Sequence, residues 1–271
     1  MFQRKLFLAR YSRRRVAWTS VGSWLTAVLT IGLGVVRTAA ADAPAGGDRI
    51  PTANGDLVIR PIDHATFVMS WNGKTIYVDP VGGGKRFESF ARPDLILITD
   101  IHGDHLNNET LSAVASDKTT IIAPSAVAEK LPENLRKQTT VLANGETKSL
   151  HEINIEAVPM YNLTQERLKF HNKGRGNGYV LTLGGKRVYI SGDTEDIPEM
   201  RALKNIDVAF VCMNLPYTMD VNQAASAVRE FRPRIVYPYH YRGSDVEKFK
   251  SVVGNDRDVE VRLRDWYQAK P

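Results

Sequence analysis

Four residues that can bind a metal ion crowd the segment 94-DLILITDIHGDHL-106, namely Asp100, His102, Asp104 and His105. They follow an apolar run, residues 95–98, which predicts a strand covered on both faces. A loop at the end of a buried strand is held in position while its side chains stay accessible. Imidazole and carboxylate groups bind divalent cations of intermediate softness. The spacing therefore indicates a metal site; a polar loop or a helix start with capping aspartates is the alternative.

Two further residues of this kind follow other apolar runs. Asp193 lies in 189-YISGDTE-195 and precedes Pro198, whose position suits the start of a helix. His240 lies in 235-IVYPYHYRG-243. If the three strands are neighbours in a sheet, their ends bring these side chains to the first cluster. The sequence therefore predicts one site built from several strand ends.

The strands and helices that carry these residues alternate along the chain. Strands are expected at residues 57–62, 66–71, 74–80, 95–98, 153–158, 178–183, 186–191, 207–212 and 234–239. Helices are expected at residues 107–116, 126–131, 221–231 and 244–253. Asn-Gly at 72–73 and Gly-Gly at 184–185 predict hairpin turns. This order of buried strands and helices predicts an α/β fold in which helices cover the sheets.

The ordered motifs resemble the metallo-β-lactamase superfamily, whose signature is T-H-x-H-x-D-H, a later Asp in a G-D-T element and a final His. Here these elements are 99-TDIHGDH-105, 191-SGDTED-196 and His240. The runs 63-DHATFVMSWNGKTIYVDP-80 and 218-TMDVNQAASAVREFRPRIVYPYHY-241 resemble the branch of ascorbate-6-phosphate lactonase-like and N-acylphosphatidylethanolamine phospholipase D-like hydrolases. The resemblance implies a four-layer αββα sandwich, with a single hydrolase domain over residues 55–271.

One metal site of the superfamily is matched in full by this resemblance. Asp104, His105 and His240 stand at its ligand positions, and Asp193 stands at the position of the bridging carboxylate. Zn²⁺ is the first expectation, and the oxygen ligand at Asp100 makes Mn²⁺ or Fe²⁺ more suitable than in a site of three imidazoles. We expect one firmly bound ion and a second that is absent, weaker or held differently.

The other metal site departs from the superfamily. Asp100 stands where the first His is usual, and Asn162 stands where a His normally follows the strand near residues 155–162. Of the three usual imidazoles only His102 remains. Asn162 and His171 are candidate substitute ligands, although an exposed loop position for His171 is an open alternative.

The resemblance implies hydrolysis of an ester, lactone or phosphodiester by a metal-activated water. Asp104 would position that water, accept its proton, or both. His64 is a candidate proton donor or partner of a ligand, with a purely structural role as the alternative. Asn214 and Tyr217 would contact a small-molecule substrate or fill a turn around Pro216. Two other functions stay open: a metal-binding or redox protein without hydrolysis, and a binding protein whose site has degenerated.

The first 41 residues have the three parts of an export signal: a basic start, an apolar middle and an A-x-A site before Asp42. The run 12-SRRRVA-17 resembles a twin-arginine signal. Residues 42–54 are expected to form a linker. We therefore expect a periplasmic protein, and an uncleaved membrane anchor facing the periplasm is the alternative.

The net positive charge of the chain comes from this segment, which holds seven of the 36 basic residues and no acid. The remaining part has 29 basic and 30 acidic residues and is close to neutral. The high isoelectric point is therefore no sign of nucleic-acid binding. The single cysteine, Cys212, lies in the apolar run 207–212 and is expected to be a small core residue.

Overall fold

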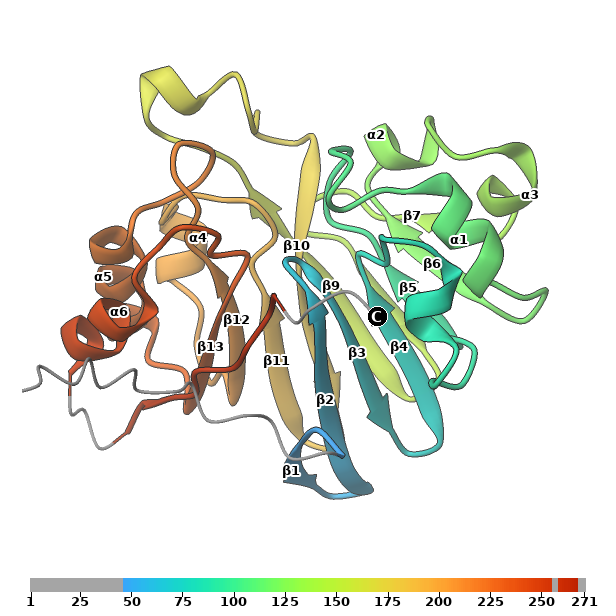
Figure 1. Ribbon diagram of the computed structural model, residues 1–271, viewed down its shortest axis with the longest axis horizontal. Helices are drawn as coiled ribbons and strands as arrows, with labels where there is room; N and C mark the ends of the chain where they lie inside the picture. The colour runs from blue at the N-terminus through green and yellow to red at the C-terminus, as the bar shows by residue number, and fades with distance from the viewer. Residues whose placement is uncertain (1–45, 255–257, 268–271) are drawn as a thin grey trace, which may run out of the picture. The chain divides into compact units, whose positions relative to one another are not determined.

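Two β-sheets packed face to face form the centre of the fold, and helices cover the outer face of each (Figure 1). The computed structural model describes residues 46–254 and 258–267. This arrangement confirms the predicted α/β sandwich of four layers. The predicted export signal over residues 1–41 lies outside the described residues. In the part of the chain that the structure describes, no helix is long and apolar enough to cross a membrane.

Each sheet has seven strands that lie side by side in chain order. The first sheet consists of β1 (Asp48–Thr52), β2 (Gly55–Asp63), β3 (Thr66–Trp71), β4 (Lys74–Val78), β5 (Leu95–Leu97), β6 (Thr120–Ala123) and β7 (Thr139–Val141). The second consists of β8 (Thr147–Leu150), β9 (Ile153–Met160), β10 (Gly176–Leu183), β11 (Lys186–Ile190), β12 (Val208–Cys212), β13 (Ile235–Tyr239) and β14 (Glu260–Val261). In both sheets the first four strands are antiparallel and the strands from the fourth onward are parallel.

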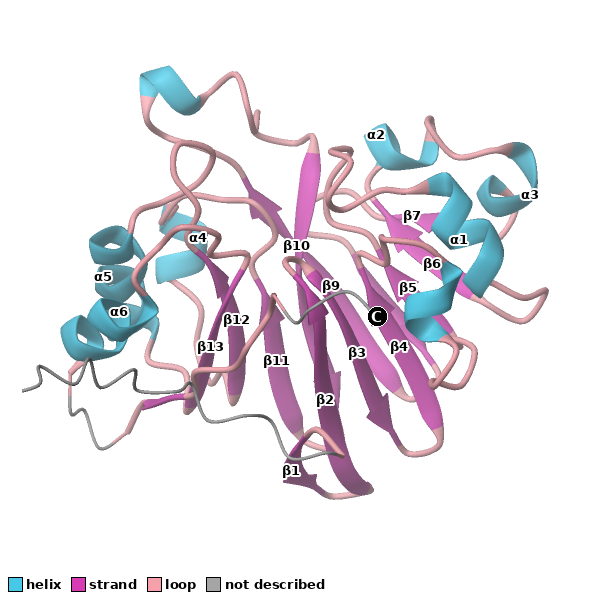
Figure 2. Cartoon of the chain, in the orientation of Figure 1, coloured by secondary structure: helices cyan, strands magenta, loops and turns pink. Residues whose placement is uncertain are grey.

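The helices connect the parallel strands and lie on opposite sides of the paired sheets (Figure 2). Beside the first sheet lie the 3₁₀ helix η1 (Gly84–Phe87), α1 (Asn108–Val114), α2 (Ser125–Ala128) and α3 (Glu133–Arg136). Beside the second lie α4 (Pro198–Arg201), α5 (Val221–Phe231) and α6 (Val246–Val253). A second 3₁₀ helix, η2 (Gln165–Arg167), belongs to the long loop between β9 and β10. The helix expected to start at Pro198 is α4, with Pro198 in its first turn.

Strand β5 shows why the apolar run before the cluster is continuous. Leu95 and Leu97 pack in the core between the sheets, whereas Ile96 and Ile98 pack under the helices with Leu111 of α1. Successive side chains of a strand point to opposite faces, so a strand covered on both sides must be apolar at every position. The predicted burial on both faces is confirmed.

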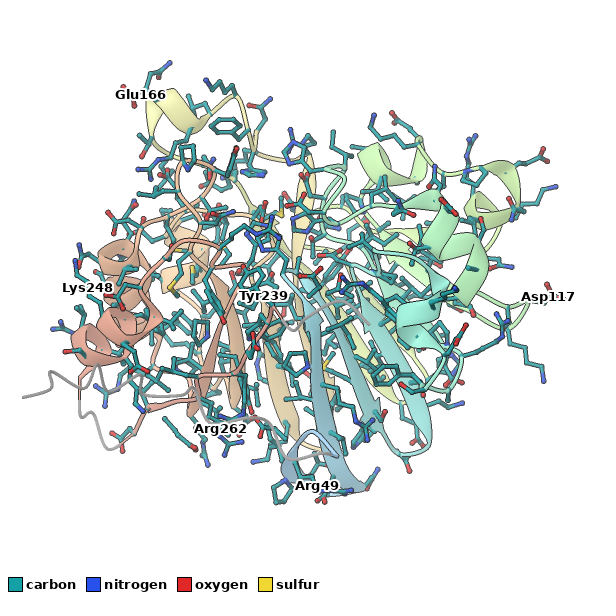
Figure 3. All side chains as sticks on the ribbon, viewed as in Figure 1. Arg49, Asp117, Glu166, Tyr239, Lys248 and Arg262 are labelled. Carbon is teal, nitrogen blue, oxygen red and sulfur yellow. The ribbon has the colours of Figure 1, made fainter. Side chains whose placement is uncertain are left out.

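Aromatic side chains fill the space between the sheets below the candidate site. Phe67 of β3 stacks on Phe210 of β12, with ring centroids 4.3 Å apart. Tyr239 and Trp266 contact both rings edge-on, and Figure 3 shows Tyr239 at the centre of the molecule's described part. Cys212 is fully buried in the same core, and burial raises the pKa of its thiol to about 12. The expectation of a structural cysteine is confirmed.

The predicted linker was wrong over part of its length. Asp48–Thr52 pairs with β2 as the edge strand β1, with Asp48 opposite Ile59. An edge strand tolerates Pro51 because one of its sides makes no ladder hydrogen bonds. Strands β6, β7 and β8 were also missed because each has only three or four residues, too few to show a strand pattern, and β7 and β8 have no fully buried position.

Truncation of Phe67 tests the packing between the sheets. We expect Phe67→Ala to lower the free energy of unfolding by about 3–5 kcal/mol, since it leaves a cavity among aromatic rings. Urea unfolding monitored by circular dichroism measures this change. Val141→Ala, at an exposed position on β7, is the control and should change stability by less than about 0.5 kcal/mol. Equal effects of the two substitutions would contradict the described packing.

Candidate metal centre

The carboxyl ends of the parallel strands bring the predicted ligands to one place. Residues 100–105 follow β5, Asp193 follows β11 and His240 follows β13. His64 joins them from the turn between β2 and β3, where its carbonyl accepts a hydrogen bond from the His240 N–H. His64 and His240 both adopt left-handed backbone conformations, with φ of 51° and 47°. Such conformations are costly and gather at functional sites. The convergence that the sequence predicts is present, while the role of each side chain stays a prediction.

Asp100, His102 and His171 form the first cluster. His102 Nδ1 lies 2.9 Å from Asp100 Oδ2, and His171 Nε2 lies 3.9 Å from the same oxygen. His171 is only 1% exposed, so the long loop between β9 and β10 folds back and buries it beside the site. The alternative of an exposed loop histidine is therefore wrong.

His105, Asp193 and His240 form the second cluster, and all three are buried. Asp193 Oδ2 lies 3.2 Å from His105 Nε2, and Asp193 Oδ1 lies 3.3 Å from His240 Nε2. Asp104 adds a more exposed carboxylate, with Oδ2 3.3 Å from the Nε2 atoms of both His240 and His64. His64 also stacks on His240, with ring centroids 3.7 Å apart.

Asp193 joins the two clusters. Its Oδ2 lies 3.2 Å from Nε2 of His105 in the second cluster and 3.2 Å from Nε2 of His171 in the first. Within the described residues, those two nitrogens and the other Asp193 oxygen are buried without a hydrogen-bond partner. Buried polar atoms are nearly always satisfied, so these orphaned atoms need a further partner. Nitrogen and carboxylate oxygen facing one point are the donor set of a divalent cation, and the residues present therefore fit a metal.

Hydrogen bonds on the side away from Asp193 fix which ring nitrogen of His105 and of His171 is available to a metal. Asp79 accepts from the N–H and the hydroxyl of Thr99, and its Oδ2 lies 2.8 Å from His105 Nδ1, so Nδ1 is the nitrogen that donates to this acceptor. The carbonyl of Tyr217 accepts from His171 Nδ1 at 3.1 Å in the same way. Both rings therefore turn Nε2 toward Asp193 as the nitrogen available to a metal, as metal-binding histidines do.

Asn162 lies beside His171 rather than replacing it. Its amide nitrogen donates to the carbonyls of Arg167 and Tyr217, at 2.9 and 2.7 Å. The same Tyr217 carbonyl binds His171, so Asn162 and His171 share one anchor. Asn162 thus supports the imidazole of His171. Both residues were candidate substitute ligands, and of the two it is His171 that lies in the first cluster with Asp100 and His102.

The two predicted substrate-binding residues lie in the turn after β12. Asn214 is buried, and its carbonyl accepts from the N–H groups of Tyr217 and Thr218. Tyr217 exposes 45% of its surface and packs its ring against Phe170, with centroids 5.0 Å apart. Tyr217 is therefore accessible beside the first cluster, whereas Asn214 closes the turn.

The electrostatics keep the three carboxylates of the site ionised. Burial alone would raise the pKa of Asp193, but His240 and His105 lower it well below its usual range. Burial also opposes ionisation of Asp104, and hydrogen bonds from His240 and His64 outweigh it and lower the pKa of that carboxyl. The pKa of Asp100 is likewise lowered despite burial, through His102, His105 and Arg175. Ionised carboxylates are the form that binds a metal.

Three residues that support the site were not predicted: Asp79, Arg175 and Glu195. Asp79 ends the run 74-KTIYVDP-80, and an acid after a buried strand was a signal that could have been used. Arg175 lies in the basic, glycine-rich stretch 173–178 and forms a bidentate ion pair with Asp100. Glu195 follows the G-D-T element and is fully buried. The contacts of Arg175 and Glu195 form only when the loop between β9 and β10 is folded, so the sequence does not show them.

Glu195 fixes the start of the loop that carries His171. Its carboxylate accepts from the N–H groups of Leu163 and Thr164, both at 2.6 Å, from the Thr164 hydroxyl at 2.7 Å, and from the Arg167 guanidinium. Burial alone would raise the pKa of Glu195, but these donors lower it. The loop is therefore tied to the end of β11 by a buried negative charge.

Comparison with known proteins identifies relatives over most of the chain. A model of the beta-lactamase superfamily domain matches residues 58–240. A UPF0173 metal-dependent hydrolase of Thermococcus onnurineus is 33% identical over 220 residues, which are 75% of this chain and 95% of that protein. One of Pyrococcus abyssi is 30% identical over 218 residues, with the same two shares. The crystal structure of a Parabacteroides distasonis protein, described as a metal-dependent hydrolase, has 43% identity and a TM-score of 0.75, covering 82% of this chain and 99% of its own.

Glu195→Gln tests the buried anchor of the loop through pH. Because folding lowers the pKa of Glu195, its stabilisation is present above the unfolded value near 4.5 and is lost as pH falls through the folded value. We expect the metal-free variant to be less stable than wild type by about 2 kcal/mol at pH 7. In urea unfolding this difference should shrink below about pH 4.

The control is Glu166→Gln on the same loop, because Glu166 is exposed and points outward in Figure 3. It should leave stability unchanged at both pH values. A destabilisation by Glu195→Gln that stays constant with pH would contradict the account of a lowered pKa.

Proposed function

The chain belongs to the metallo-β-lactamase superfamily and is a metal-dependent hydrolase, and we propose that it cleaves an ester, lactone or phosphodiester of a small molecule at a two-ion centre. The position of Asp193 carries this proposal. One of its oxygens lies equally close to an imidazole of each cluster. Two metal ions that share a bridging carboxylate are a common arrangement for hydrolysis of such bonds.

Each ion has its own ligands in this proposal. Asp100, His102 and His171 would hold the first, and Asp104, His105 and His240 would hold the second, with Asp193 shared. Zn²⁺ is the first candidate because nitrogen and oxygen ligands suit it. The carboxylate of Asp100 adds a hard ligand to the first set and favours Mn²⁺ or Fe²⁺ there.

Bound ions would supply a water with a pKa lowered to about 7 and would polarise a carbonyl or phosphoryl oxygen. Asp104 is suited to orient that water, since its side chain is 44% exposed whereas Asp193 is almost fully buried. Its lowered pKa keeps it free of a proton at neutral pH. It can therefore accept a hydrogen bond from the water and align it with the substrate.

His64 orients Asp104 through a fixed tautomer. The Tyr241 N–H donates to the Tyr267 oxygen at 2.9 Å, so the phenol proton is free to point to His64 Nδ1, 2.7 Å away. Burial raises the pKa of Tyr267 and keeps that proton in place. His64 then carries its own proton on Nε2 and directs it to Asp104 Oδ2 at 3.3 Å. This geometry supports a positioning role for His64. The same Nε2–H group is also the one that could donate a proton to the leaving group.

The finer aspects of function belong to the same proposal. The likeness of the opening strands and of the α5 region to the lactonase-like and phospholipase D-like branch supports an ester or phosphodiester substrate. The exposed ring of Tyr217 beside the first cluster is placed to contact it. The basic and apolar pattern of residues 1–41 supports export to the periplasm.

Asp104→Ala tests the proposed chemistry. We expect kcat/KM on p-nitrophenyl esters and bis(p-nitrophenyl) phosphate to fall by about 100- to 10,000-fold, because the water loses its orienting group. Asp104→Asn keeps the volume and should show a similar loss. The control is Asp117→Ala, at the far right of Figure 3, which should retain wild-type rates. Wild-type turnover by both Asp104→Ala and Asp104→Asn would contradict the proposed role of Asp104.

Tyr267→Phe tests the tautomer of His64. Without the phenol proton, His64 can protonate Nδ1 and lose its hydrogen bond to Asp104, so we expect kcat to fall about tenfold with KM and metal content unchanged. Steady-state kinetics with metal analysis measure this. Tyr161→Phe, which removes a hydroxyl bonded to Glu199 instead, is the matched control and should keep wild-type kcat. An unchanged kcat in Tyr267→Phe would leave His64 without this role.

A further inference from the structure

Arg175 binds the buried carboxylate of Asp100 with two parallel hydrogen bonds. Its Nε lies 3.1 Å from Asp100 Oδ1, and its Nη2 lies 2.9 Å from Asp100 Oδ2. The Asp100 side chain is fully buried and that of Arg175 is 18% exposed. In the described part of the chain, no other lysine or arginine pairs with Asp100. Two parallel bonds from a planar guanidinium fix both the position and the plane of a carboxylate.

The same guanidinium also holds the loop that carries His171. Nη2 donates to the carbonyl of Phe170, the residue before His171. Arg175 itself lies next to the start of β10, where the Asn177 N–H donates to the Thr99 carbonyl at 2.9 Å. Arg175 therefore ties the strand end that bears Asp100 and His102 to the loop that bears His171.

The charge of the pair explains the departure from the superfamily's pattern. The resemblance places a neutral imidazole at position 100, whereas Asp100 brings a negative charge into a site that already has Asp104 and Asp193. The positive charge of Arg175 offsets it. The pair as a whole is neutral, like the imidazole it stands for.

We propose that Arg175 is the positioning residue of the first ion site: it aims Asp100 and holds His171 against it, so that Asp100 and Arg175 together replace one imidazole ligand. This inference rests on the proposed two-ion function. Lysine could supply the charge but neither the paired hydrogen bonds nor the third one to Phe170. Loss of Arg175 should therefore weaken the first ion and spare the second.

Metal titration of the full chain, stripped of metal, tests this. With Mn²⁺ followed by calorimetry, wild type should bind two ions. Arg175→Gln should bind one of them about 10- to 100-fold more weakly, as is usual when a partner of a ligand is removed, and the other unchanged. Arg175→Lys should also lose affinity at that ion only. Lys173→Ala is the matched control, because this cation of the same loop pairs with Glu199.

The same substitution in an Asp100→His background separates positioning from general support of the fold. There Arg175 has no carboxylate to aim and keeps only its hydrogen bond to Phe170, so Arg175→Gln should cost clearly less affinity for the first ion than it does with Asp100 present. Wild-type binding of both ions by Arg175→Gln would overturn the inference, as would an equal loss in the two backgrounds. Fewer than two ions in wild type would instead contradict the proposed function on which the inference rests.

Discussion

Three carboxylates stay ionised within one small, mostly buried site, and the surrounding strands and loops are arranged to hold them there. Asp100 and Asp193 are almost completely removed from water, and Asp104 lies beside them. Burying such charges is costly unless cations compensate them. The imidazoles of His105 and His171 turn Nε2 toward Asp193 as the nitrogen available to a metal, because their outer hydrogen bonds occupy Nδ1. Divalent cations are the compensation that the donor set fits.

Strand ends and one long loop together supply the residues that surround these carboxylates. The parallel halves of the two sheets end at the same place and deliver Asp79, the 100–105 loop, Asp193 and His240. Strand ends fixed by apolar packing on both faces allow little movement. The loop between β9 and β10 then adds His171, and buried contacts through Glu195 and Arg175 hold that loop down. Strand ends give the site its framework, and the loop completes it.

How much of this could be predicted from the sequence depended on the range of the interactions. The 100–105 cluster, Asp193 and His240 could be predicted because each follows an apolar run, and the order of such runs is visible locally. The fold class followed from the same alternation. Contacts made by loop folding could be predicted only in part: His171 could be named as a candidate ligand with an exposed position as the alternative, whereas the pairing of Arg175 with Asp100 forms only after the loop turns back, and no periodicity encodes that turn. Strand β1 was missed because the adjoining stretch 42-DAPAGGD-48 is typical of a linker, whereas the pairing of Asp48–Thr52 with β2 depends on the edge of a sheet.

The proposed function places one ion on each side of Asp193. Anomalous X-ray diffraction from crystals of the full chain, collected on both sides of the absorption edges of zinc, iron and manganese, would test it most directly. We expect two peaks, one between Asp193 and the Asp100, His102 and His171 side chains, and one between Asp193 and the Asp104, His105 and His240 side chains. If crystals grown with these metals show no peak next to Asp193, or show peaks only at other places, the two-ion centre is contradicted.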